Sequence, residues 1–137
     1  MKSEKIFLLV VEDSLPLMER MLYLFEGVSE IEFILHAANS SETLRTINEM
    51  PVDVVLLDIN LPDGNGIDIL KKIKEIRPET KVVMFTNYAA KAFRDACYKL
   101  GADGFLEKSS DFEKVPQMIT NLFFNNNPNP KTVKLVC

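Results

Sequence analysis

Residues 52–66 are VDVVLLDINLPDGNG, an apolar run that ends on Asp58 and then enters a segment rich in turn-forming residues. The run at 52–57 has the length and apolar character of a buried strand. The Asn, Pro, Asp and Gly residues at 60–66 predict a turn. A helix is expected to follow over 67–77, because Pro78 cannot continue it.

The same alternation of strand-length apolar runs and helix-length amphipathic segments extends along the rest of the chain. The continuous run at 6–11 is typical of a strand covered on both faces. The run at 31–37 is interrupted by Glu32 and His36, which favours an edge position. The predicted strands are 6–11, 31–37, 52–57, 81–85 and 103–107. The predicted helices are 15–26, 40–49, 67–77, 89–100 and 115–124.

Five strands that alternate with five helices predict an α/β fold, a doubly wound five-stranded parallel sheet with helices on both faces. Right-handed crossovers favour the flavodoxin-like strand order 2-1-3-4-5. In such a sheet, ligands bind beyond the carboxyl ends of the strands, at the switch between the first and third strands. Residues 1–124 form the predicted domain, and the Asn/Pro-rich residues 125–137 are expected to form a flexible tail.

Composition limits the class of protein. The chain has 137 residues, a net charge of −4 and 47% apolar residues, which fits one globular domain and excludes wholesale disorder. No apolar run approaches the roughly 18 residues of a membrane span, and the first is too short for a secretory leader. A pI near 5.1 argues against direct nucleic-acid binding. Two cysteines cannot form a disulfide framework. We therefore expect a cytoplasmic protein without membrane contact.

The predicted strands end in residues that carry chemistry. Glu12 and Asp13 follow the first strand, Asp58 the third, Thr86 the fourth and Lys108 the fifth. Three converging carboxylates repel one another unless a proton or a cation compensates them, and Mg²⁺ prefers such oxygen ligands. A carboxylate nucleophile, Mg²⁺, an ammonium group and a hydroxyl group together suit phosphoryl transfer.

At these residues the chain resembles the receiver domain of a two-component response regulator, over about residues 5–124. The matching pattern consists of the acidic pair Glu12-Asp13, the stretch DINLPDGNG at 58–66, Thr86, and the stretch FLEK at 105–108. The resemblance implies that Asp58 accepts a phosphoryl group from a histidine kinase or a histidine phosphotransfer protein.

The resemblance also implies a magnesium site. Asp13 and Asp58 would bind Mg²⁺ directly, together with the backbone carbonyl of Asn60. Glu12 stands where the family more often has Asp, and it would act through a coordinated water.

Three further residues would respond to the phosphoryl group. Lys108 would pair with the Asp58 carboxylate and then with phosphoryl oxygens, and Thr86 would hydrogen-bond one of those oxygens. Phe105 stands at the family's switch aromatic and, lacking a hydroxyl group, would act through packing alone. The output would be a changed surface on the fourth helix, fifth strand and fifth helix. Ser109 replaces the family's usual proline, which leaves open whether the Lys108–Ser109 peptide is cis.

The leading hypothesis is a stand-alone response regulator that signals to an unknown protein target. It would be no enzyme, but a phospho-acceptor that assists its own phosphorylation and dephosphorylation. Two alternatives stay open: a phosphorylation-independent receiver-like adaptor, and the receiver part of a longer regulator. A phosphatase of the haloacid-dehalogenase type would need a second Asp where Asn60 stands. Phe105 has the alternative of a core aromatic that does not switch.

The first predicted helix carries more apolar residues than one buried stripe requires. We hypothesise that the excess, including Leu15 and Leu17, contacts a kinase or phosphotransferase beside the acidic site. His36, the only histidine, is interpreted as structural.

Overall fold

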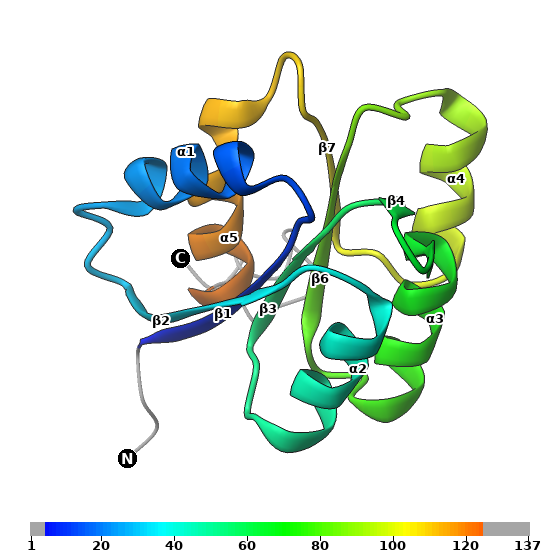
Figure 1. The fold of residues 1–137 in the computed structure, drawn as a ribbon, viewed down its shortest axis with the longest axis horizontal. Helices are drawn as coiled ribbons and strands as arrows, with labels where there is room; N and C mark the ends of the chain where they lie inside the picture. Colours follow the sequence, from blue (N-terminus) through cyan, green and yellow to red (C-terminus); the bar gives the residue numbers. More distant parts are fainter. Residues whose placement is uncertain (1–4, 125–137) are drawn as a thin grey trace, which may run out of the picture.

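The computed structural model describes residues 5–124, and the tail predicted at 125–137 lies outside them. A five-stranded parallel sheet with the order β2-β1-β3-β6-β7 forms the centre of the fold (Figure 1). Its strands are β1 (Ile6–Val11), β2 (Ile31–Ala37), β3 (Val54–Leu57), β6 (Lys81–Thr86) and β7 (Gly104–Glu107). The predicted fold and the order 2-1-3-4-5 of the main strands are confirmed, with strand 2 at an edge.

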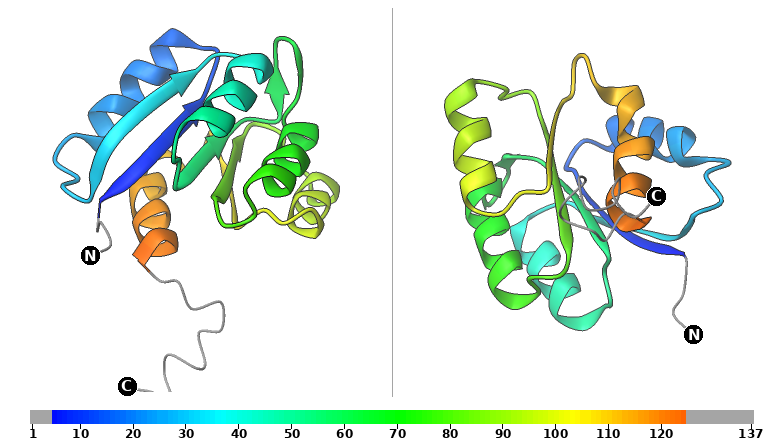
Figure 2. Two further views of the ribbon diagram at one scale, coloured as in Figure 1. Left: turned by 90° about the horizontal axis from the view of Figure 1, so that it is seen from below. Right: turned by 180° about the vertical axis from the view of Figure 1, so that it is seen from behind.

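Helices cover both faces of the sheet, as Figure 2 shows. They are α1 (Leu15–Phe25), α2 (Ser40–Glu49), α3 (Gly66–Ile76), α4 (Lys91–Lys99) and α5 (Val115–Phe124). One buried cluster joins α1 and α5 to the sheet, and another joins α2, α3 and α4 to its other face. Because β1 and β3 contribute side chains to both clusters, their apolar runs are continuous.

Local signals explain where helices begin and end. The Asn39 side chain accepts a hydrogen bond from the Glu42 amide at 2.9 Å, and the Glu42 carboxylate accepts one from the Ala38 amide at 2.8 Å. This pairing of side chains and backbone amides caps the start of α2. After α1, Gly27 adopts a φ of 84°, the left-handed conformation that glycine tolerates best.

Two small elements were not predicted. The turn-rich segment contains an antiparallel hairpin of β4 (Asn60–Leu61) and β5 (Gly64–Asn65). A 3₁₀ turn, η1 (Phe112–Lys114), precedes α5. None of the helices in residues 5–124 has the length and apolar character needed to cross a membrane.

Gly66 packs against the backbone directly after β3. Its amide donates a 2.6 Å hydrogen bond to the Ile59 carbonyl, and a methyl group on its α-carbon would overlap the Asp58 carbonyl oxygen. The hairpin therefore folds back onto the residue that follows β3, and only glycine fits at this contact.

Candidate functional site

Three carboxylates meet at the carboxyl edge of the sheet. One oxygen from each of Glu12, Asp13 and Asp58 can be chosen so that all three lie within 4.8 Å of one another. Glu12 and Asp58 are buried, whereas Asp13 is exposed. The convergence predicted from the strand ends is present, because β1 and β3 are neighbours in the sheet.

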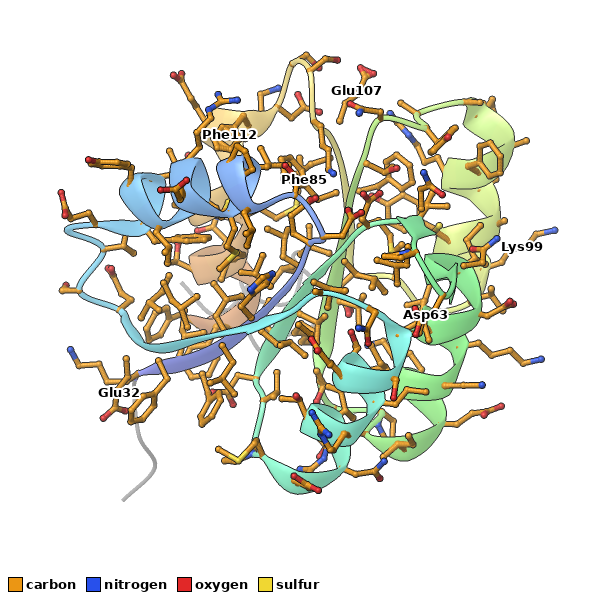
Figure 3. All side chains as sticks on the ribbon, in the orientation of Figure 1. Glu32, Asp63, Phe85, Lys99, Glu107 and Phe112 are labelled. Carbon is orange, nitrogen blue, oxygen red and sulfur yellow. The ribbon has the colours of Figure 1, made fainter. Side chains whose placement is uncertain are left out.

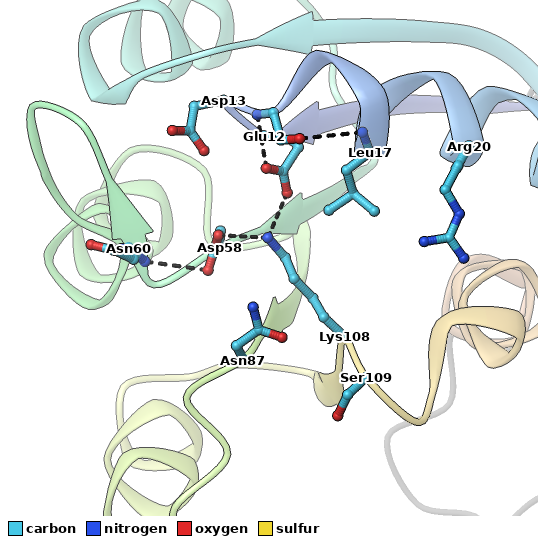
Figure 4. A pocket seen from close by; sticks show the side chains of 10 residues that line it. Glu12, Asp13, Leu17, Arg20, Asp58, Asn60, Asn87, Lys108 and Ser109 are labelled. Carbon is cyan, nitrogen blue, oxygen red and sulfur yellow. Dashed lines mark hydrogen bonds and ion pairs between the residues drawn. The ribbon is translucent and has the colours of Figure 1, made fainter.

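Lys108 lies between two of these carboxylates, as Figure 4 shows. Its Nζ is 2.7 Å from Glu12 Oε1 and 2.8 Å from Asp58 Oδ2. Burial alone would lower the pKa of Lys108, but hydrogen bonds and charge interactions with Asp58 and Glu12 outweigh it and raise the pKa above its ordinary value. The ammonium group therefore stays charged at neutral pH.

The remaining carboxylate oxygens of these two residues accept backbone hydrogen bonds. Glu12 Oε2 accepts one from the Ser14 amide at 3.0 Å, and Asp58 Oδ1 accepts one from the Asn60 amide at 3.2 Å. Both buried side chains are thus fixed by one ion pair and one backbone donor each. The Asp13 carboxylate has no hydrogen-bond partner among the described residues.

Thr86 and Phe105 are buried, and neither is among the residues that surround the open side of the acidic cluster. Thr86 is fully buried, and its hydroxyl accepts a 3.1 Å hydrogen bond from the Tyr88 amide. Phe105 is also buried in the core, with the guanidinium of Arg94 5.2 Å from its ring centroid. The Lys108–Ser109 peptide is trans, since residues 5–124 contain no cis bond. The proposed switching roles of Thr86 and Phe105 stay predictions.

A cavity of about 440 Å³ opens over the acidic cluster. Besides the predicted site residues, it is lined by Leu17, which was expected beside the acidic site, and by Ser14, Arg20, Asn87 and Ser109. Asn87 directly follows β6, so the same strand-end rule that selected Thr86 points to it. Arg20 was missed because the strand-end rule does not reach residues on α1. Its guanidinium lies 4.3 Å from the Phe112 ring centroid. Phe112 in turn stacks with Phe85 (Figure 3).

The donor set fits a hard divalent cation. When ionised, three carboxylates and one ammonium group leave a formal charge of −2, and every candidate ligand atom is an oxygen. Mg²⁺ prefers such ligands and retains several waters, for which the open cavity has room. Asn60 lines the same cavity beside Asp58.

An acidic, lysine-paired site at the carboxyl edge of a 2-1-3-4-5 parallel sheet defines a class of α/β regulatory domains. The chain belongs to the response regulator receiver domain family, whose model matches residues 8–120. It is thus the receiver domain of a two-component response regulator.

Individual relatives agree with this membership. The photosynthetic apparatus regulatory protein RegA of Cereibacter sphaeroides is 33% identical over 109 residues, which cover 79% of this chain and 58% of RegA. A CheY-like receiver domain protein from Methanospirillum hungatei is 26% identical with a TM-score of 0.79, covering 88% of this chain and 95% of that one. The BeF₃-activated receiver domain of DrrB from Thermotoga maritima is 25% identical with a TM-score of 0.71, covering 85% and 96%. The chain spans about half the length of the curated relatives it matches.

Proposed function

We propose that this protein is a phosphorylation-switched response regulator whose Asp58 accepts a phosphoryl group from a histidine kinase or a histidine phosphotransfer protein. The observation that carries the proposal is the Asp58 carboxylate, fixed 2.8 Å from Lys108 Nζ inside an acidic cluster that opens into a cavity. Membership in the receiver family and the existence of a BeF₃-activated relative support it.

In this proposal an oxygen of the Asp58 carboxylate attacks the phosphorus of the donor. An O–P bond forms while the bond from phosphorus to the donor's nitrogen or oxygen breaks, and the donor leaves with that electron pair. Lys108 remains protonated and neutralises charge on the phosphoryl oxygens.

Bound Mg²⁺ would supply further positive charge to the transferred group, held by Asp13, Asp58 and the backbone carbonyl of Asn60. Both oxygens of Glu12 are already engaged, one by Lys108 and one by the Ser14 amide. Asp58 is engaged in the same way, by Lys108 and the Asn60 amide. In this proposal Glu12 acts through a coordinated water, as the resemblance to the family pattern implies.

Signalling would begin when the Thr86 hydroxyl bonds to a phosphoryl oxygen. Thr86 ends β6, and its hydroxyl now accepts from the Tyr88 amide, so its rotation would release the loop that leads to α4. Phe105 already lies buried in the core with the Arg94 guanidinium over its ring, so it would respond through a change in packing alone. The result is a population shift on the face formed by α4, β7 and α5, read by a protein partner.

We propose that the protein is no enzyme toward external substrates, but a phospho-acceptor that assists its own phosphorylation and dephosphorylation. Asn60 follows Asp58 by two residues and carries no carboxyl group that could act as a general acid. The second candidate is an adaptor that works without phosphorylation, and the intact set of Asp58, Thr86 and Lys108 disfavours it.

The test is the intact mass of the protein after incubation with an acyl phosphate, in Mg²⁺ and in EDTA. We expect a Mg²⁺-dependent gain of one phosphoryl group in the wild type and in Asp63→Asn, and none in Asp58→Asn. Asp63 is the matched control, because it lies in the same loop but accepts hydrogen bonds from the start of α2 instead. A folded wild type that gains no mass would favour the adaptor.

A further inference from the structure

His36 lies at the carboxyl end of β2 and contacts the loop that carries the acidic pair. Its Nε2 is 2.6 Å from the backbone carbonyl oxygen of Glu12. In the sheet, His36 stands opposite Val10, so its side chain lies on the same face of the sheet as α1 and α5, where it is exposed to solvent. A carbonyl oxygen can only accept a hydrogen bond, so Nε2 carries the hydrogen.

His36 and Ala37 hold the two backbone polar groups of Glu12, its carbonyl and its amide. The Glu12 amide donates a 2.9 Å hydrogen bond to the Ala37 carbonyl, while the Glu12 carbonyl accepts from His36. The peptide that joins Glu12 to Asp13 is therefore held at its carbonyl by a side chain from the neighbouring strand.

This restraint has its largest consequence at Asp13. Glu12 and Asp58 each have an ion pair and a backbone donor that hold their carboxylates. No described residue hydrogen-bonds the Asp13 carboxylate, so its place in the cluster depends on the backbone, which directs its Cα–Cβ bond, and on its own side-chain torsions. A change in the orientation of the preceding peptide would move this carboxylate away from Asp58.

We propose that His36 is a positioning residue for the cation site: its Nε2–H orients the Glu12–Asp13 peptide so that the Asp13 carboxylate faces Asp58. The inference deepens the proposed function, and rests on it in taking Asp13 as a ligand of Mg²⁺. Outer partners that orient metal ligands contribute to metal affinity although they do not touch the metal. His36 itself is outside the group of candidate ligands.

Two substitutions separate the hydrogen bond from the bulk of the ring. His36→Gln keeps an N–H donor at the same number of bonds from Cβ as Nε2, whereas the donor in His36→Asn is one bond shorter. Glu32→Gln is the matched control, because it is an exposed residue at the other end of β2 (Figure 3). The full chain is used for every variant.

The readout is the Mg²⁺ dissociation constant, measured by titration calorimetry on unphosphorylated protein well below its melting temperature. We expect His36→Asn to weaken Mg²⁺ binding about fivefold, the equivalent of one neutral hydrogen bond, with His36→Gln and Glu32→Gln close to the wild type. Long-range ¹H–¹⁵N spectra of the metal-free wild type should show a protonated Nε2. Equal Mg²⁺ affinity in His36→Asn and the wild type would overturn the proposal, as would equal losses in the Asn and Gln variants.

The outcome is independent of the phosphorylation test. If the wild type gains no phosphoryl group but His36→Asn binds Mg²⁺ more weakly than His36→Gln, the proposed function fails and the positioning role stands. If the wild type is phosphorylated and all three variants bind Mg²⁺ alike, only the positioning role fails.

Discussion

Replacing Lys108 with methionine removes the cation shared by two buried carboxylates while keeping most of the side-chain volume. The side chains of Lys108, Glu12 and Asp58 are 12%, 4% and 9% exposed, and the two ion-pair distances are 2.7 and 2.8 Å. In Lys108→Met, Glu12 and Asp58 face each other and Asp13 with no protein cation between them. The folded state then contains an uncompensated negative cluster that the unfolded chain does not have.

The size of the effect follows from the burial. Removing one partner from a buried ion pair costs about 3–5 kcal/mol, and the open cavity lets water recover part of this. We therefore expect Lys108→Met to lower the free energy of unfolding by about 3 kcal/mol in EDTA at neutral pH, which corresponds to a melting temperature lower by about 10 °C. Mg²⁺ should reduce the loss, because it supplies positive charge at the same oxygens.

The assay is urea unfolding followed by circular dichroism, in EDTA and in Mg²⁺. Lys91→Met is the matched control: it breaks a 2.7 Å ion pair with Asp95 whose side chains are 87% and 54% exposed. This control should lose no more than about 0.5 kcal/mol. In the Lys108→Met background, Glu12→Gln should restore stability by removing one repelling charge. Similar losses in the two lysine variants, or no recovery with Glu12→Gln, would refute the reasoning.

Three further predictions concern the cation, the close packing behind Asp58 and the pH dependence. Mg²⁺ at ten times its dissociation constant should stabilise the wild type by about 1.4 kcal/mol in thermal unfolding, and Asp13→Asn should lose most of this gain. Gly66→Ala should cost at least about 2 kcal/mol in urea unfolding, because the added methyl group overlaps the Asp58 carbonyl; Gly64→Ala, which meets only a serine side chain, should cost less. Backbone hydrogen bonds from the start of α2 lower the pKa of Asp63 below 3.8, so its ionised form stabilises the fold above that pH. Asp63→Asn should therefore reduce stability near neutral pH, and acid titration should show the difference vanishing as pH falls through the lowered pKa.

The sheet and the convergence of Glu12, Asp13 and Asp58 could be predicted because both depend on features that the sequence displays directly. Continuous apolar runs mark strands covered on two faces, and parallel order brings their carboxyl ends to one edge. The residue that follows each run is then a site candidate. The same rule, applied one residue further along, would have included Asn87, which lines the cavity.

Other features depend on side-chain geometry that no pattern records. Lys108 contacts Glu12 as closely as Asp58, and the Thr86 hydroxyl caps its own loop; both are choices among rotamers and partners that the tertiary structure settles. The β4–β5 hairpin has only two residues in each strand, too few to show a period. The contact of His36 with the Glu12 loop could not be predicted from the sequence, because its partner is a backbone carbonyl, which every residue has.

The exposed part of α1 agrees with the excess of apolar residues that its sequence indicates. Leu15, Leu22 and Tyr23 are exposed, whereas Met18 and Met21 are buried in the core. Leu17 lines the cavity beside the acidic cluster. Contact between this surface and a kinase or phosphotransferase stays a prediction, which Leu15→Asp and Leu17→Asp would test through the rate of phosphotransfer from a cognate kinase.

The most direct measurement is to locate the phosphoryl group after labelling with an acyl phosphate in Mg²⁺. Borohydride reduces an aspartyl phosphate to the corresponding alcohol, and peptide mass mapping then identifies the carboxyl group that was modified. We predict reduction at position 58 alone, with Asp13 and Glu12 unchanged. Reduction at Asp13 or Glu12 with Asp58 intact, or a stable label on a hydroxyl side chain, would contradict Asp58 as the phospho-acceptor.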